Sequence, residues 1–157
     1  MLSFGVNTIE PIAPHGDIVP SFSISKLVSA SGKIMLAEDG TVWTLANNPN
    51  RIAGINNIVE VASSDNSYYA LDTKGNVWAW GYNGYGQLGN GTTENKYIPT
   101  KIEKLKDIKK VYISGNTSIA INNKGEVYVW GYEYSKEPTK IKTYNKIVSA
   151  SGKIIRI

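Results

Sequence analysis

One glycine-rich segment has the spacing of a phosphate-binding loop. Gly84-Tyr85-Gly86-Gln87-Leu88-Gly89 satisfies the pattern G-x-G-x-x-G, which in dinucleotide-binding proteins places a pyrophosphate at the N-terminus of a helix. That chemistry requires a helix directly after the glycines, whereas this chain continues with Asn90-Gly91-Thr92-Thr93-Glu94-Asn95. The segment therefore predicts turns and no cofactor site.

Residues suited to acid–base, nucleophilic or metal chemistry are sparse. His15 is the only histidine and the chain has no cysteine, so a metal site built from several histidines or from thiolates is excluded. Asp39 and Asp72 come just before turn glycines, where aspartate commonly hydrogen-bonds its own backbone two residues on. This position favours structural turns over the paired carboxylates of a glycosidase. We predict no catalytic, cofactor-binding or metal-binding residue, and hence no enzyme.

Tyrosines supply the candidate binding residues. Five of them fall in or beside predicted loops: Tyr82, Tyr85, Tyr97, Tyr132 and Tyr134. A tyrosine offers a rigid ring with a polar tip, which suits a protein partner or the face of a sugar ring. Packing of some of these rings between repeat units is an equally good interpretation. The tryptophans fall within predicted strands, where we expect core packing: Trp43, Trp78, Trp80 and Trp130.

The elements that would position these tyrosines are clearest in residues 75–102. Val77 to Trp80 are β-branched, aromatic, small and aromatic in turn, which suits a strand covered on both faces. Five glycines follow within the eleven positions 81–91, a density expected where the backbone needs positive φ or approaches another backbone closely. The stretch predicts a strand, a turn that reverses the chain, and a second strand near Pro99.

A set of positions in and just before this stretch forms a family pattern. They are Leu71, Asp72, Gly75, Val77, Trp78, Trp80, Gly81, Asn83, Gly86, Gln87, Leu88, Gly89, Gly91 and Pro99. Together they resemble the repeat of the regulator of chromosome condensation (RCC1-like) family, whose members are β-propellers. The resemblance implies structural roles for these residues, and for Gly125 and Trp130 in the next unit. It also implies an all-β fold of blades made from short antiparallel strands.

Turn glycines followed by valine and an aromatic residue recur along the chain. The pairs are Val42-Trp43, Val77-Trp78 and Val127-Tyr128, after Gly40, Gly75 and Gly125. The glycines are 35 and 50 residues apart, an irregular period that is expected when loops absorb the differences in length. Repeats of short strands with periods of this size are typical of propeller blades. We predict a repeat domain over residues 26–157, with units 26–57, 58–107 and 108–143 and a half unit 144–157.

The two ends of the chain look complementary. Residues 1–25 contain three prolines and read as an N-terminal arm, or as the outer strands of a shared blade if Phe4-Gly5-Val6-Asn7 corresponds to Trp80-Gly81-Tyr82-Asn83. Residues 148–154 are identical to residues 28–34, so the chain ends halfway through a blade. We expect self-association into a closed ring, with a dimer favoured. The alternatives are a longer protein of which this is an arc, or a partner that covers the open sheets.

Length and composition fit one folded domain. The 157 residues are 41% hydrophobic and 19% charged. Much of the net charge of +4 comes from residues 101–110, where five lysines alternate with two acids; such mixed signs favour a solvated connection over nucleic-acid binding. No stretch approaches the ~20 apolar residues of a membrane span, and the start lacks a signal-peptide pattern. Localisation is left open.

The functional expectation is a non-catalytic β-propeller scaffold of about three to four blades. It would bind a protein partner, of unknown identity, through loops on one rim that carry the five tyrosines; the alternative is a carbohydrate-binding module. The resembled family includes nucleotide exchange on a small nuclear GTPase, which needs a full ring, and bacterial members that bind other proteins. Because a composition rich in Lys, Ile, Asn and Tyr suits an AT-rich bacterial genome, we expect a bacterial protein.

Overall fold

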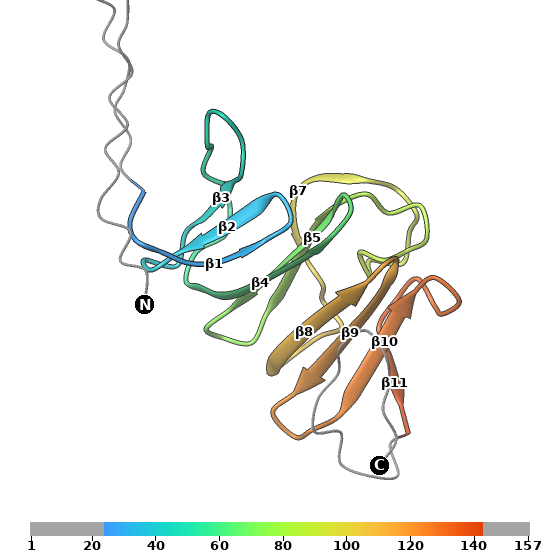
Figure 1. Ribbon diagram of the computed structural model, residues 1–157. Coiled ribbons are helices and arrows are strands. Elements are labelled where there is room, and N and C mark those ends of the chain that lie inside the picture. The colour runs from blue at the N-terminus through green and yellow to red at the C-terminus, as the bar shows by residue number, and fades with distance from the viewer. Residues whose placement is uncertain (1–23, 143–157) are drawn as a thin grey trace, which may run out of the picture.

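The computed structural model describes residues 24–142, which form three antiparallel sheets and no helix (Figure 1). The first sheet holds β1 (Leu27–Ser31), β2 (Ile34–Ala37) and β3 (Val42–Thr44). The second holds β4 (Ile58–Ser64), β5 (Ser67–Asp72), β6 (Val77–Gly81) and β7 (Lys96–Lys101). The third holds β8 (Ile108–Ser114), β9 (Thr117–Asn122), β10 (Val127–Gly131) and β11 (Thr139–Ile141). None of these described residues lies in a helix that could cross a membrane. The predicted N-terminal arm and half unit fall largely outside the described residues.

Within each sheet the strands follow one another as a meander, and the sheets lie side by side along the chain (Figure 1). The first strand of each sheet is the inner one, since β4 contacts β1 and β2 on one side and β8 on the other. The inner pair carries the same register shift in all three sheets, after Leu27, Ile58 and Ile108. This shared irregularity makes the three sheets structural copies of one unit.

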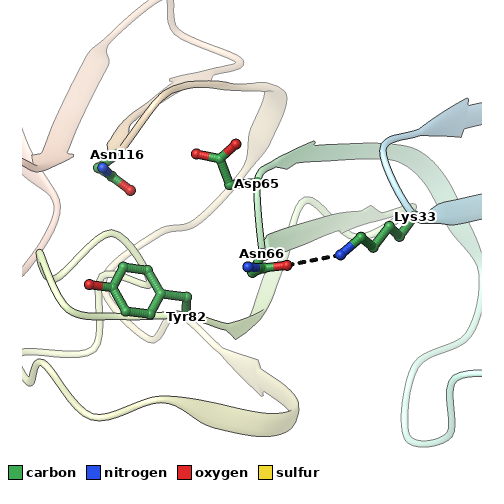
Figure 2. A pocket seen from close by; sticks show the side chains of 5 residues that line it. All are labelled: Lys33, Asp65, Asn66, Tyr82 and Asn116. Atoms are coloured by element: carbon green, nitrogen blue, oxygen red, sulfur yellow. Dashed lines mark hydrogen bonds between the residues drawn. The ribbon is translucent and has the colours of Figure 1, made fainter.

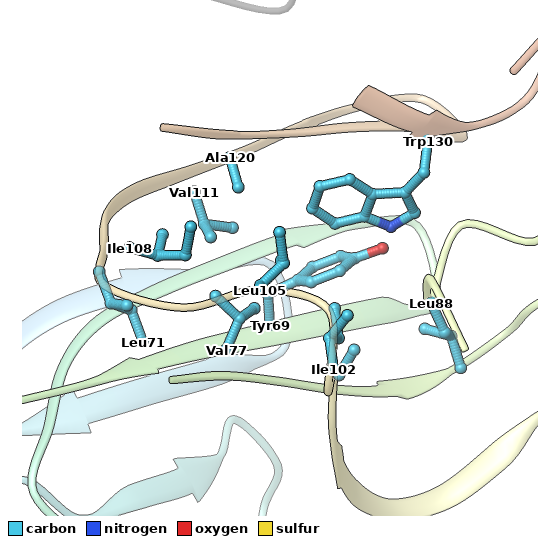
Figure 3. Close-up of a cluster of buried hydrophobic side chains, with 11 residues drawn as sticks. Tyr69, Leu71, Val77, Leu88, Ile102, Leu105, Ile108, Val111, Ala120 and Trp130 are labelled. Atoms are coloured by element: carbon cyan, nitrogen blue, oxygen red, sulfur yellow. The ribbon is translucent and has the colours of Figure 1, made fainter. Parts of the chain in front are cut away.

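Two apolar layers fill the spaces between the sheets. Between the second and third sheets, Tyr69, Leu71 and Val77 meet Ile108 and Trp130 in one buried cluster (Figure 3). A similar cluster between the first and second sheets contains Ile34, Leu36, Val42, Ile55, Ile58, Val61, Ala70 and Trp80. The second sheet is therefore covered by an apolar layer on each face, which explains why β5 reads as a nearly continuous buried run instead of an alternating pattern.

The turn glycines mark the points where one sheet passes to the next. The amide of Ile108 donates to the carbonyl of Gly75 at 3.1 Å, and the amide of Ile58 donates to the carbonyl of Gly40 at 3.0 Å. A Cβ on Gly75 would lie 2.9 Å from the backbone of Asp107, and φ at Gly75 is 78°. The position requires glycine for both its positive φ and its lack of a side chain.

One sequence expectation about the core needs correction. The first sheet has three strands where the others have four, because residues 50–52 pair with β3 only through the Trp43–Arg51 bridge and two flanking backbone hydrogen bonds. Trp80 and Trp130 are core residues as expected, but Trp43 and Trp78 are only partly buried. The reason is that both lie close to their turns, where the indole N–H of Trp43 donates to Thr41 and that of Trp78 donates to Asp72.

Candidate binding surface

Three of the five candidate tyrosines meet on the surface. The ring of Tyr85 contacts that of Tyr82 with centroids 6.2 Å apart and that of Tyr132 with centroids 5.2 Å apart, both edge to face. The three side chains are 41 to 51% exposed. We call Tyr82, Tyr85 and Tyr132 the tyrosine surface. It joins the loop after β6 to the loop after β10, which lie in neighbouring sheets.

The other two candidate tyrosines are placed differently. Tyr134 lies in the turn after β10, about half exposed, and makes none of the ring contacts found among the described residues. Tyr97 lies on the outer strand β7 and is 89% exposed, beside the exposed Ile98. Neither one packs between sheets, so they contribute little to the cores.

Two glycines at the ends of β6 and β10 set the positions of Tyr82 and Tyr132. Gly81 and Gly131 have φ of 100° and 101°. A Cβ on either would lie within 2.2 Å of a carbonyl oxygen, that of Asn66 or of Asn116. The amide of Tyr82 donates to the same Asn66 oxygen, and that of Tyr132 to the Asn116 oxygen, both at 2.9 Å. Each glycine–tyrosine pair is thereby held against the turn between the first two strands of its own sheet, which we call the inner hairpin turn.

A buried asparagine organises the long loop that carries Tyr82 and Tyr85. The side-chain oxygen of Asn83 accepts the amide of Leu88 at 2.9 Å, and its NH2 group donates to the carbonyls of Thr92 and Glu94 at 3.0 and 2.9 Å. Gly86 and Gly89 have φ of 74° and 70°, which confirms the predicted glycine turns. The G-x-G-x-x-G segment is thus a compact loop, and no helix follows it in the described chain.

Gln87 ties this loop to the third sheet. Its Oε1 accepts the amide of Tyr85 at 3.0 Å, and its Nε2 donates to Oδ1 of Asn116 at 3.0 Å. Its carbonyl accepts the indole N–H of Trp130 at 2.7 Å and the hydroxyl of Tyr69. Burial raises the pKa of Tyr69, so that hydroxyl stays a donor. The tyrosine surface therefore stands on a loop whose base is buried and hydrogen-bonded.

A polar hollow adjoins the tyrosine surface. Its volume is about 600 Å³, and its lining comes from all three sheets: Lys33, Asp65, Asn66, Tyr82 and Asn116 (Figure 2). Lys33 Nζ donates to Oδ1 of Asn66 at 3.1 Å. The carboxylate of Asp65 has no hydrogen-bond partner within the described part of the chain. The hollow therefore combines a hydrogen-bonded lysine, an aspartate without a described partner and two asparagine amides, beside exposed aromatic rings.

The first residue of each inner hairpin turn distinguishes the second sheet from its neighbours. This residue has φ of 56° at Gly32, 48° at Asp65 and 57° at Gly115. Glycine is the usual occupant of this position in a two-residue turn, so aspartate at Asp65 is the exception. Asp65, Asn66, Asn116 and Lys33 were not predicted as site residues. The available signal was their recurrence at the turn between the first two strands of each unit.

The carboxylates considered for catalysis have structural roles. Asp39 Oδ1 accepts the amide of Thr41 at 3.0 Å, and Asp72 Oδ1 accepts the amide of Lys74 at 2.9 Å, which confirms the predicted turns. Hydrogen bonds from the Thr41 hydroxyl and amide lower the pKa of Asp39. Burial opposes ionisation of Asp72, but hydrogen bonds led by those from Asn76 outweigh it and lower its pKa. Neither carboxylate faces the hollow.

No metal-binding cluster of His, Asp or Glu occurs within residues 24–142. His15 lies outside this described range.

Two family models match the repeat units of the second and third sheets. Residues 74–121 match the model of the regulator of chromosome condensation (RCC1) repeat, and residues 58–87 match a second model of the same description. The chain carries RCC1-like repeats. The family resemblance is thus confirmed, and with it the all-β fold of a partial β-propeller.

Solved structures agree with this fold. Human WBSCR16 matches with a TM-score of 0.66 at 19% identity, over 76% of this chain and 38% of that protein. Prp20p from Saccharomyces cerevisiae, described together with its binding properties to Gsp1p and histones, matches with a TM-score of 0.61 at 20% identity, over 71% of this chain and 36% of that protein. The RCC1-like chain thus spans well under half the length of either protein, and the likeness concerns the fold.

Proposed function

We propose that this RCC1-like chain is a non-catalytic propeller arc that binds a protein partner through the tyrosine surface. The observation that carries the proposal is the edge-to-face cluster of Tyr82, Tyr85 and Tyr132, half-exposed and standing on a buried, hydrogen-bonded loop base. Rigid aromatic rings lose little entropy on binding, and tyrosine is enriched among the residues that dominate protein interfaces.

The polar hollow supports a partner that offers a cationic side chain. Asp65 occupies a turn position where the neighbouring sheets have glycine, and its carboxylate is unpaired among the described residues. Non-glycine residues held at positive φ cluster at functional positions. A lysine or arginine of the partner would pair with Asp65 while apolar groups cover the rings. The named partners of Prp20p, which are Gsp1p and histones, are likewise proteins.

The geometry of the rings favours a protein over a sugar. Tyr85 lies at 75° to Tyr82 and at 85° to Tyr132. A sugar ring stacks on a flat aromatic face, whereas perpendicular rings make a ridged surface. We therefore place the carbohydrate-binding alternative second.

The arc itself is proposed to close with other blades, in a larger ring or in a dimer. Leu27 is 39% exposed, although its counterparts Ile58 and Ile108 are 4% and 3% exposed beneath the preceding sheet. Leu45, which takes the place of Trp80 and Trp130, is 55% exposed. The first sheet therefore lacks a blade ahead of it in the described chain, and a second copy would supply one. Light scattering tests this closure: a well-folded monomer of the full chain contradicts the dimer.

The binding proposal is tested with partners isolated from the native source and then purified. The double variant Tyr85→Ser/Tyr132→Ser should weaken binding of the purified partner at least about tenfold. Tyr97→Ser is the matched control, because Tyr97 is more exposed but lies away on β7. Equal losses in both variants, or none in the double variant, contradict the proposal. So does glycan-array binding that the double variant abolishes.

A second variant separates binding from stability. Asp65→Gly restores the residue found at this turn in the other two sheets, so the free energy of unfolding should stay equal or rise slightly. Binding of the purified partner should nevertheless fall. Unchanged binding would remove the hollow from the interface and leave the tyrosine surface alone.

A further inference from the structure

The second residue of each inner hairpin turn lines the polar hollow. The three turns lie at residues 32–33, 65–66 and 115–116, between the paired ends of the first two strands of each sheet. Their second residues are Lys33, Asn66 and Asn116. Each of these side chains carries a nitrogen donor, and the directions of their hydrogen bonds decide which donors remain unused.

The orientation of the Asn116 amide is fixed by a chain of hydrogen bonds. The backbone amide of Tyr85 can only donate, so the Gln87 atom that accepts it at 3.0 Å is the side-chain oxygen. The other end of the fully buried Gln87 side chain is then its NH2 group, which donates to Oδ1 of Asn116 at 3.0 Å. Nδ2 of Asn116 has no hydrogen-bond partner among the described residues. Asn116 thus keeps an unused donor group at the hollow.

The orientation of the Asn66 amide is fixed in the same way. The ammonium of Lys33 can only donate, so the Asn66 atom that accepts it at 3.1 Å is Oδ1. Figure 2 shows Nδ2 of Asn66 on the side away from Lys33, toward Tyr82 and Asn116. No described residue accepts a hydrogen bond from this group, and Lys33 uses one of its three donor hydrogens in the bond to Asn66. All three turn residues therefore have donors to offer a ligand.

These donors lie beside an unpaired carboxylate. Asp65 lines the same hollow, and its carboxylate lies on the side of Asn116 in Figure 2. A ligand that carries only a cation would satisfy Asp65 and leave Lys33 and the two amides without acceptors, which weakens a complex from which water is excluded. A dianionic group such as a phosphate would be repelled by Asp65. The lining is therefore complementary to a cation and a single negative charge placed side by side.

We propose that the partner places a carboxylate in the hollow, next to the cationic side chain that pairs with Asp65. The carboxylate accepts hydrogen bonds from the unused donors of Lys33, Asn66 and Asn116. The partner segment therefore carries a basic residue beside an acidic one. Charge-assisted hydrogen bonds of this kind are stronger than neutral ones and fix the orientation of the segment. This inference rests on the proposed function, since it adds a second charged group to the same partner.

Two blocked dipeptides test the inference without an identified partner. N-acetyl-Arg-Asp-amide offers the cation and the carboxylate, whereas N-acetyl-Arg-Asn-amide offers the same cation and a neutral carbonyl. In NMR titrations of the full chain, the Asp dipeptide should shift the side-chain NH2 signals of Asn66 and Asn116 and bind at least about fivefold tighter than the Asn dipeptide. Equal dissociation constants, tighter binding of the Asn dipeptide, or no shift of these signals by the Asp dipeptide would overturn the proposal.

Isosteric variants give a second test that keeps the contacts of the folded chain. Asn66→Asp and Asn116→Asp retain the Oδ1 that accepts Lys33 or Gln87 and replace only the unused NH2 group by an anionic oxygen. Each should weaken binding of the Asp dipeptide at least about fivefold, and neither should weaken the Asn dipeptide. Asn123→Asp is the control, because it adds the same charge in the turn after β9, away from the hollow. If either variant binds the Asp dipeptide as tightly as the Asn123→Asp control, the proposal is overturned.

The outcomes separate this inference from the proposed function. If partner binding depends on Tyr85 and Tyr132 while the two asparagine variants leave dipeptide binding unchanged, the proposed function stands and this inference alone fails. If the Asp dipeptide binds with the stated preference but the double tyrosine variant keeps full affinity for the purified partner, the proposed function fails instead.

Discussion

The second and third sheets are the same blade with different loops. Each has four strands in one order, the same register shift in its inner pair and a glycine followed by tyrosine at the end of its third strand. Between the third and fourth strands, however, the second sheet has residues 82–95 and the third has only residues 132–138. The strand framework is therefore repeated, while the loop is specific to each unit.

The long loop stabilises the junction between the sheets as well as presenting Tyr85. It buries Gln87 and Leu88 against Tyr69 and Trp130, whereas the short loop serves as its outer support. The amide of Gly91 in the long loop donates to the carbonyl of Lys136 in the short loop at 3.0 Å. The short loop also contacts the link after β7, where Lys104 pairs with Glu137 at 2.5 Å. The repeat thus determines the strands of each blade, whereas the length of the loop after the third strand determines whether that loop packs between two neighbouring sheets.

The largest expected effect comes from removing the ring that meets the long loop. Trp130→Ala should lower the free energy of unfolding by about 3–5 kcal/mol, because a fully buried indole is lost and the Gln87 carbonyl loses a donor. Urea denaturation measures this change. Tyr128→Ala, on the same strand and face but only partly buried, should cost clearly less. Equal costs would show that the long loop does not depend on Trp130.

The next effect concerns the glycine that lies against this ring. A Cβ on Gly89 would lie 2.8 Å from Nε1 of Trp130, at φ of 70°. Gly89→Ala combines backbone strain with overpacking and should cost about 2–4 kcal/mol. Gly54→Ala is the control, because φ at Gly54 is 84° and no described atom lies within 4 Å; it should cost about 1 kcal/mol from strain alone. Thermal denaturation measures both losses. If Gly54→Ala lowers the stability as much as Gly89→Ala or more, the packing argument is contradicted.

A smaller effect tests whether the turns of the two sheets are interchangeable. Asp72 accepts the Trp78 indole N–H at 3.1 Å, while Asn122 instead donates to Glu126 at 2.7 Å. Asp72→Asn should cost about 1–2 kcal/mol near neutral pH, since the indole loses its acceptor. Adding Asn76→Glu imports the Asn–Glu pair of the third sheet and should recover most of that loss. If the double variant is no more stable than Asp72→Asn, the turns are not equivalent.

The smallest effect is a difference in acid sensitivity between these two turns. The pKa of Asp72 is held below its ordinary value of 3.8 in the folded protein. Its contribution to stability is therefore complete above about pH 3.8 and is lost as the pH falls through the folded-state pKa. The Asp72→Asn variant lacks this carboxylate, so its stability should fall less between pH 7 and pH 3 than that of the unmodified chain. Identical acid profiles from urea denaturation would contradict a role for Asp72 ionisation.

The local strand pattern was readable from the sequence. The Val-aromatic pairs after Gly40, Gly75 and Gly125 predicted β3, β6 and β10 to within about a residue, because a turn glycine and β-branched residues act through local backbone geometry. The family resemblance followed from the same short-range positions. Burial was harder to predict: Trp78 was expected in the core, but its indole N–H donates to Asp72 in the adjoining turn and the side chain is only partly buried.

The sequence by itself determined the blade: its strands, its turn glycines, its apolar faces and its membership of a repeat family. Only the tertiary structure decided which tyrosines form a surface, because Tyr85 and Tyr132 are far apart in the chain and meet only through the stacking of two sheets. The same holds for Asp65 and Asn116 around the hollow, and for the burial of Asn83 and Gln87. Strand formation depends on neighbours along the chain, whereas these sites depend on the angle and spacing between blades, which arise from the summed packing of the layers between them.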